Sequence, residues 1–202
     1  MWQKIRRLIT PELKEKVVYS FPFRLYNRWK MGKKFIRFSI EITTKCNNNC
    51  SMCTRGRLIK QGRLKITDMA NETVKSILEQ IKIFVNRGYQ VTFAPMGMGE
   101  PLLFKNLYPL IGDLKGISPK VKVEIVTNGV LLDGKMAKKL VDLGVDEINI
   151  SLNVNNSADY KRYVGGDKYQ LVVDNIKNLI LYRNKRAAEG TNVFIQYLEE
   201  GI

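Results

Sequence analysis

The sequence predicts an α/β fold built on a parallel sheet. Short strand-like segments rich in β-branched and aromatic residues recur along the chain, and segments of helical length separate them. Connections of that length favour parallel strands joined by right-handed crossovers. The 202 residues, of which 45% are hydrophobic, suffice for one well-packed domain.

The expected elements follow one another in a regular order. A first strand is expected at 35–42, and a cysteine-containing loop ends it. Helical spacing of apolar residues predicts a helix over 68–87, with Thr67 or Asp68 as its N-cap and Gly88 at its end. The other expected elements are a strand at 90–94, a helix at 107–114, a strand at 121–126, a helix at 135–143, a strand at 147–152, a helix at 169–183 and a strand at 193–198.

Residues 1–34 are interpreted as a basic and aromatic N-terminal extension ahead of a core domain at 35–202. Pro11 and Pro22 interrupt the extension, which favours short helical pieces over one long helix. We expect the extension to pack on the outside of the core domain. An arm that docks on an anionic surface or a partner is the alternative.

The charge balance is strongly basic, with 34 Lys and Arg against 19 Asp and Glu and a net charge of +15. Such a field favours an anionic substrate, an acidic peptide, an anionic surface or nucleic acid. Nucleic acid is the less favoured substrate, because net charge reports non-specific association and not mechanism.

All three cysteines, Cys46, Cys50 and Cys53, lie in the loop after the first expected strand. Their odd number and close spacing argue against a disulfide framework, and in a reducing cytoplasm clustered cysteines more often indicate metal or redox chemistry. The sequence shows no signal peptide and no apolar run of the roughly 18 residues that a membrane-spanning helix needs. We therefore expect a cytoplasmic protein without a transmembrane segment.

The absence of histidine limits the chemistry of this loop. It removes Ser–His and Cys–His hydrolytic sites and any zinc site that needs imidazole. Three thiolates can hold a [4Fe–4S] cluster and leave one iron open to a small molecule. A zinc ion completed by a carboxylate is the alternative.

The cysteine loop, residues 46–53, matches the CxxxCxΦC signature of the radical S-adenosylmethionine (radical SAM) enzymes, with Met52 before its last cysteine. The loop after the second expected strand resembles the GGEP motif of this family, with Met98 in place of the first glycine. The later strand ends at 127–129 and 151–153 are also similar to those of the family. The resemblance begins at Phe35, covers most of the chain and looks closest to the cofactor- and peptide-maturation enzymes of the SPASM/twitch type.

This resemblance implies a parallel barrel of six strands, of which five are counted here. The expected fold class is thus a partial parallel (β/α) barrel of the radical SAM type, with a core domain that is C-terminally incomplete. It also implies a [4Fe–4S] cluster on Cys46, Cys50 and Cys53, and S-adenosyl-L-methionine on the open iron. Cleavage of that cofactor would give a 5′-deoxyadenosyl radical for hydrogen abstraction, and no catalytic side chain is assigned.

The implied partners are a reductant such as flavodoxin or ferredoxin and an unidentified substrate. Modification of a peptide or a cofactor is the favoured reaction. The alternatives are an RNA-modifying radical SAM enzyme, a non-catalytic iron–sulfur protein and an inactive fragment of such an enzyme.

The resemblance also assigns cofactor-binding residues at the strand ends. Met52 would lie near the adenine, Gly99 would let the backbone approach the methionine amino group, and Ser151 with Asn153 would bind the ribose or carboxylate. In the alternative, the glycines only form a turn, Glu100 only caps the segment after it, and the polar strand ends only face solvent. The full set is Met52, Gly97, Gly99, Glu100, Pro101, Thr127, Asn128, Ser151, Asn153 and Gln196.

Overall fold

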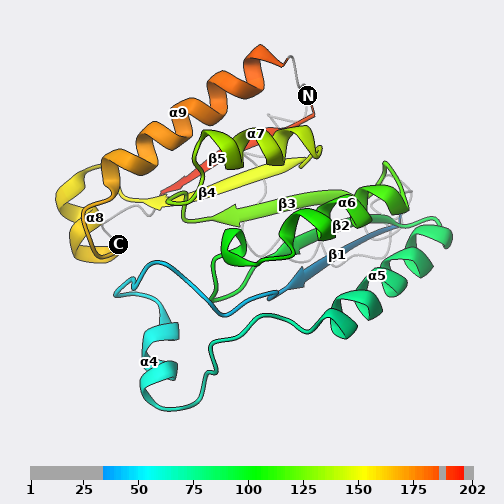
Figure 1. Cartoon of the computed structure of the whole chain (residues 1–202), viewed down its shortest axis with the longest axis horizontal. Helices are drawn as coiled ribbons and strands as arrows, with labels where there is room; N and C mark the ends of the chain where they lie inside the picture. The colour runs from blue at the N-terminus through cyan, green and yellow to red at the C-terminus, as the bar shows by residue number, and fades with distance from the viewer. Residues whose placement is uncertain (1–33, 187–189, 198–202) are drawn as a thin grey trace, which may run out of the picture. The chain divides into compact units, whose positions relative to one another are not determined.

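Five parallel strands form one sheet in the computed structural model, which describes residues 34–186 and 190–197 (Figure 1). The strands pair in sequence order, β1-β2-β3-β4-β5, and every pair is parallel. Their bounds are β1 Phe35–Ile40, β2 Gln90–Pro95, β3 Lys122–Thr127, β4 Glu147–Asn153 and β5 Asn192–Tyr197. The parallel α/β architecture predicted from the sequence is confirmed.

Helices connect these strands. The bounds are α4 Thr54–Lys60, α5 Asn71–Asn86, the short 3₁₀ helix η1 Pro101–Leu103, α6 Leu107–Ile117, α7 Gly134–Asp142, α8 Ser157–Tyr163 and α9 Tyr169–Lys185. Every strand and long helix that we predicted has both ends within three residues of the predicted ends, where those ends are described. The predicted end of the last strand at Leu198 and the predicted extension, apart from Lys34, lie outside the described residues.

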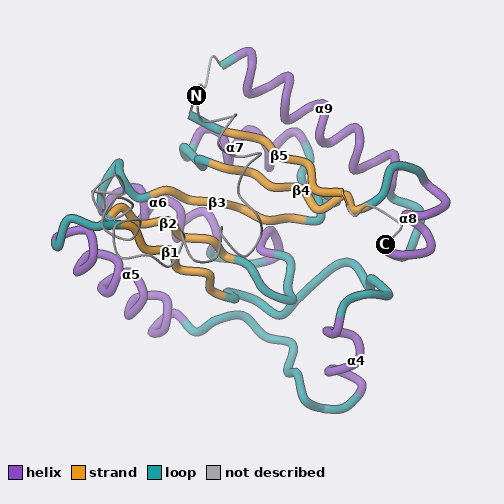
Figure 2. Tube along the Cα trace, turned by 180° about the vertical axis from the view of Figure 1, so that it is seen from behind, coloured by secondary structure: helices purple, strands orange, loops and turns teal. Residues whose placement is uncertain are grey.

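The long helices cover one face of the sheet, and the alternating burial of β4 follows from this arrangement (Figures 1 and 2). In β4 the buried residues Ile148, Ile150 and Leu152 alternate with half-buried polar residues. The core therefore lies between sheet and helices. On the other face, the guanidinium of Arg37 in β1 pairs with the Glu124 carboxylate in β3 at 2.5 and 2.9 Å.

The glycine predicted to end the first long helix does so. Gly88 has a φ of +80°, a conformation that favours glycine, directly after the C-cap of α5. Its N–H donates to Val85 O, and the N–H of Tyr89 donates to Phe84 O. The rings of Phe84 and Tyr89 pack edge to face at 5.2 Å. This Schellman arrangement turns the chain from α5 into β2.

The predicted N-cap of α5 is wrong. The helix begins at Asn71, its N-cap is Ala70, and no side chain caps it. The carboxylate of Asp68 instead accepts from the Thr43 hydroxyl at 2.7 Å and from the Lys45 ammonium at 2.8 Å. The residues that looked like a cap in the sequence therefore make a polar contact with the segment before the cysteine loop.

In the part of the chain that the structure describes, no helix is long and apolar enough to cross a membrane.

Candidate cofactor site

The cysteine loop leaves the carboxyl end of β1 and is tied down on two sides. Cys46, Cys50 and Cys53 are free thiols and are half-buried. The N–H of Ser51 donates to Tyr163 O at the end of α8, at 2.8 Å. The Nε of Arg55 in α4 donates to Thr44 O at 2.7 Å. Helices α4 and α8, which the sequence analysis did not predict, thus hold the loop.

Glu100 joins the motif loop after β2 to the end of β3. Its side chain is buried, with 2% of the residue exposed. One carboxylate oxygen accepts from the Thr127 hydroxyl at 2.7 Å and from Leu102 N–H at 3.1 Å. The other oxygen accepts from Asn128 N–H at 2.8 Å, and the N–H of Glu100 donates to Lys45 O at 2.7 Å.

Burial dominates the electrostatics of this carboxyl group. Loss of hydration raises the pKa of Glu100, although the three hydrogen bonds oppose the rise. The three hydrogen bonds that this carboxylate accepts come from protein donors. The one from Leu102 N–H is the capping contact that the alternative interpretation predicted. The assignment of Glu100 to cofactor binding stays a prediction.

Asn128 connects the end of β3 to the cysteine loop. Its Nδ2 donates to the side-chain Oδ1 of Asn47 at 2.7 Å and lies 3.9 Å from the Cys46 sulfur. Its Oδ1 accepts from Val130 N–H, so both ends of the amide have partners. The structure therefore brings Glu100, Thr127 and Asn128 together with the first cysteine.

The two glycines of the motif loop lie where side chains would not fit. A Cβ on Gly99 would meet Thr43 O at 1.9 Å, and a Cβ on Gly97 would meet a Glu41 oxygen at 2.5 Å. That Glu41 carboxylate accepts from Met98 N–H at 2.5 Å. The glycines thus permit close packing of the motif loop on the segment between β1 and the cysteines. Pro101 is buried and begins η1.

The other predicted residues lie on the same rim without hydrogen bonds to the cysteine loop among the described residues. Ser151 in β4 is in register with Gln196 in β5, so both share the face that the long helices leave uncovered. Asn153 ends β4 with a φ of 65°, uncommon for a non-glycine residue. Met52 in the cysteine loop is 47% exposed. Their roles toward a cofactor also stay predictions.

The residues of the cysteine loop fit a thiolate-bound cluster. Three soft sulfur donors lie within eight consecutive residues, and a cavity of about 470 Å³ opens beside Cys50 and Cys53. The Nδ2 of Asn47 is buried without a hydrogen-bond partner, and the buried amide of Asn48 interacts with the buried hydroxyl of Tyr160. An orphaned group such as the Nδ2 of Asn47 is costly unless a bound group satisfies it. The loop therefore has both ligands and an unused polar atom for a bound cofactor.

The geometry of the thiols differs from that of a single-ion site. Among the described residues, no three Cys, Asp, Glu or His side chains converge as they do around one metal ion. A [4Fe–4S] cluster does not require such convergence, because each thiolate binds a different iron. Burial raises the pKa of the Cys46 and Cys50 thiols, and their thiol neighbours add to the effect. Cluster binding would consequently release protons.

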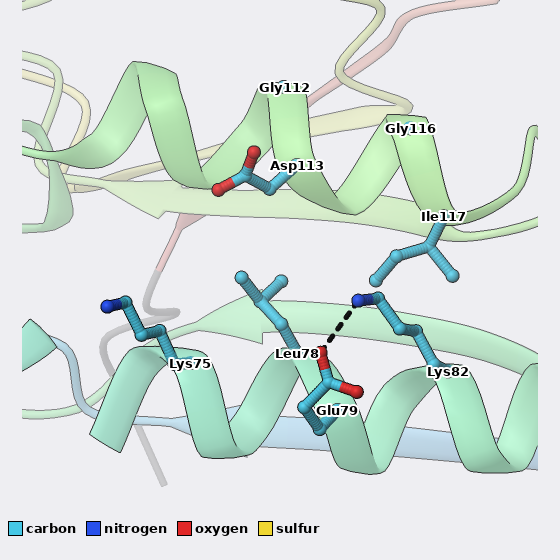
Figure 3. A pocket seen from close by; sticks show the side chains of 8 residues that line it. All are labelled: Lys75, Leu78, Glu79, Lys82, Gly112, Asp113, Gly116 and Ile117. Carbon is cyan, nitrogen blue, oxygen red and sulfur yellow. Dashed lines mark hydrogen bonds and ion pairs between the residues drawn. The ribbon is translucent and has the colours of Figure 1, made fainter. Parts of the chain in front are cut away.

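A second cavity, of about 450 Å³, lies between α5 and α6 in the helical layer (Figure 3). Its walls carry Lys75, Asp113 and a Glu79–Lys82 ion pair, and Gly112 and Gly116 open one side. None of the predicted site residues lines it. It therefore has no part in the candidate site.

Sequence reasoning missed several residues that build this site. Glu41 contacts the motif loop, Asn47 contacts Asn128, and Asn48 is buried within the cysteine loop. The available signal was position alone, because all three lie between the end of β1 and the second cysteine. Which of these amides and carboxylates point inward depends on contacts with distant segments.

The chain resembles known proteins over most of its length. It matches the family model described as the Radical SAM superfamily over residues 40–194. It is 34% identical over 152 residues to a protein named "Probable GTP 3′,8-cyclase" of Methanococcus maripaludis strain C5, covering 75% of this chain and 47% of that protein. It is 31% identical over 160 residues to a GTP 3′,8-cyclase of Lactiplantibacillus plantarum, covering 76% of this chain and 43% of the relative.

The fold also resembles solved structures. A structure of BtrN in complex with AdoMet and 2-DOIA superposes with a TM-score of 0.57 and 21% identity, covering 81% of this chain and 57% of that one. This likeness concerns the fold alone. The chain spans about half the length of the curated relatives that it matches.

Proposed function

This chain belongs to the radical SAM superfamily, whose cofactors are a [4Fe–4S] cluster and S-adenosyl-L-methionine, and we propose that it abstracts hydrogen from a small anionic substrate. Bound to Cys46, Cys50 and Cys53, a [4Fe–4S] cluster would supply the electron for reductive cleavage of S-adenosyl-L-methionine, the source of the radical that abstracts hydrogen. The observation that carries the proposal is the cysteine loop, tied through Asn128 and Glu100 to the ends of two further strands. Ligands in parallel α/β folds bind at such strand ends.

The residues of the chain hold and orient the cofactors in this proposal. Cys46, Cys50 and Cys53 would bind three irons, and Asn128 would keep the first cysteine in place. Gly99 would keep the motif loop close to the backbone before the cysteines. The uncovered face near Ser151 and Gln196 would receive the nucleoside part of S-adenosyl-L-methionine.

For the substrate, we take a purine nucleotide, GTP first, as the leading candidate. The relatives named above are called GTP 3′,8-cyclases, and their name does not support the peptide substrate that the sequence analysis also favoured. The net charge of +15 suits an anionic substrate. A reductant such as flavodoxin or ferredoxin would supply the electrons. The three free thiols suit a reducing compartment, for which we propose the cytoplasm.

Anaerobic reconstitution with iron and sulfide tests the proposal. With dithionite and S-adenosyl-L-methionine, the reconstituted protein should form 5′-deoxyadenosine, measured by chromatography, and GTP should increase the yield. The Cys50→Ala variant should lose iron and activity together, because the sequence has no spare cysteine.

A cluster spectrum without any 5′-deoxyadenosine would defeat the enzyme assignment and leave a non-catalytic iron–sulfur protein. Formation of 5′-deoxyadenosine that GTP leaves unchanged would defeat only the nucleotide assignment.

A further inference from the structure

The segment around the cysteine loop has a one-sided charge. From Ile42 to Thr67 the chain carries Lys and Arg but no Asp or Glu. Lys45 pairs with Asp68, and the Nε of Arg55 binds Thr44 O. The remaining cations are exposed and pair with no carboxylate among residues 34–186 and 190–197; we call Arg57, Lys60, Arg63 and Lys65 the α4 basic patch.

Part of this patch lies beside the last two cysteines. Arg57 and Lys60 line the cavity of about 470 Å³ that also has Cys50 and Cys53 in its wall. The chain then turns back toward the segment before Cys46, where the Thr44 hydroxyl donates to Lys65 O at 2.7 Å. Positive charge therefore lies beside Cys50 and Cys53, and the backbone at Lys65 contacts the segment before Cys46.

Packing in the core does not explain the composition of helix α4. It has no buried residue, and Figure 1 shows it beyond the carboxyl end of β1, away from the long helices. A helix of this kind contributes little to the core. Its exposed face is available to a partner.

We propose that the α4 basic patch is the docking surface for an acidic one-electron carrier protein, an inference that rests on the proposed function. The carrier loses one electron and the cluster gains it. Electron transfer slows steeply with distance, so the carrier has to dock beside the cluster ligands. An acidic carrier matches the patch in charge, and such encounters use small interfaces and are steered electrostatically.

The test uses the reconstituted protein with purified flavodoxin and its NADPH-dependent reductase. The variant R63E/K65E reverses two patch charges outside the cavity that the cysteines line. The control K120E/K185E makes the same change in net charge at two exposed lysines that precede β3 and β5, at the opposite ends of the strands. Binding of flavodoxin and the flavodoxin-dependent rate of 5′-deoxyadenosine formation are measured at low and high salt.

In R63E/K65E, the Kd and the KM for flavodoxin should rise about tenfold at low salt and converge with the wild-type values at high salt. The dithionite-driven rate and the iron content should stay unchanged, and the control should behave as wild type. Unchanged flavodoxin binding in R63E/K65E, or an equal loss in the control, would overturn the proposal. A variant that loses affinity for single-stranded RNA but keeps its affinity for flavodoxin would also overturn it, because the patch would then serve nucleic acid.

Failure of the proposed function has a different signature. A wild-type protein that forms no 5′-deoxyadenosine with dithionite fails as an enzyme, whatever its partner. The flavodoxin binding measurement needs no turnover and still decides whether the patch docks an acidic carrier.

Discussion

At the scale of single residues, the buried side chain of Glu100 links the loop after β2 to the end of β3 at the rim of the sheet. Its buried carboxylate accepts from the Thr127 hydroxyl and from the N–H groups of Leu102 and Asn128. The motif indicated Glu100 as a candidate site residue, but it did not indicate that the side chain points inward. That direction depends on β3, which follows about 20 residues later in the chain.

Removal of this carboxylate should cost stability. Glu100→Ala leaves three buried donors without an acceptor, and we expect a loss of about 2–5 kcal/mol in the free energy of unfolding. Urea denaturation measures it. The exposed Glu79→Ala, which loses only a surface ion pair with Lys82, serves as the control and should change stability by less than about 1 kcal/mol. Equal losses in both variants would refute the structural role of Glu100.

The raised pKa of Glu100 also predicts the pH dependence of stability. An acid whose pKa rises on folding contributes most to stability below its unfolded pKa, and this contribution falls as the pH rises through the folded pKa. The stability of the wild type relative to Glu100→Gln should therefore decrease from about pH 4.5 upward. A relative stability that increases over this range would show that the hydrogen bonds outweigh burial.

Asn128 should influence the cluster electronically. Its amide N–H lies 3.9 Å from the Cys46 sulfur, and donors near cluster sulfurs stabilise the reduced, more negative state. Asn128→Ala should lower the reduction potential of the reconstituted cluster, measured by a redox titration followed by EPR. Asn106→Ala, which loses a surface contact with Asn71, should leave the potential unchanged. An unchanged potential in Asn128→Ala would remove this residue from the site.

At the scale of elements, the strongly periodic segments were predictable and the short ones were not. Buried parallel strands are continuous apolar or alternating runs, so the sequence placed all five correctly. Helices α4 and α8 have seven residues each, and only Tyr160 of α8 is buried in them. With so little apolar periodicity, such helices leave no clear signal.

Two glycines in different elements should respond oppositely to alanine. Gly99→Ala forces a methyl group against Thr43 O and should destabilise the protein by about 1–3 kcal/mol. Gly112→Ala in α6 meets no atom within 4 Å and should stabilise it by about 0.5–1 kcal/mol. Thermal and urea unfolding of both variants give the signs. A neutral Gly99→Ala would mean that the motif loop does not need the close approach seen here.

At the scale of the whole molecule, the site arises because parallel pairing gathers strand ends at one edge. The ends of β1, β2 and β3 supply the cysteine loop, Glu100 and Asn128, and the ends of β4 and β5 add Ser151 and Gln196. The parallel strands predicted from the sequence imply this gathering. The contacts between Asn128, Asn47 and Cys46 were not predictable, because they depend on how three loops pack.

Part of the positive charge of the molecule lies close to the cysteine loop. The net charge of +15 alone predicted an anionic partner of some kind. Because no acidic residue lies between Glu41 and Asp68, one share of this positive charge lies in the segment that contains the cysteines. If that share steers an acidic carrier, then flavodoxin-driven turnover should weaken with salt more steeply than dithionite-driven turnover.

The central claim is that the cysteine loop holds a [4Fe–4S] cluster with one iron open to S-adenosyl-L-methionine. EPR spectroscopy of the dithionite-reduced, reconstituted protein tests it most directly, with spectra recorded before and after addition of this cofactor. We predict the signal of a reduced [4Fe–4S] cluster, and a change in its g values on addition because the cofactor binds the open iron. A spectrum that the cofactor leaves unchanged, or a protein that retains zinc and no iron, would contradict the account.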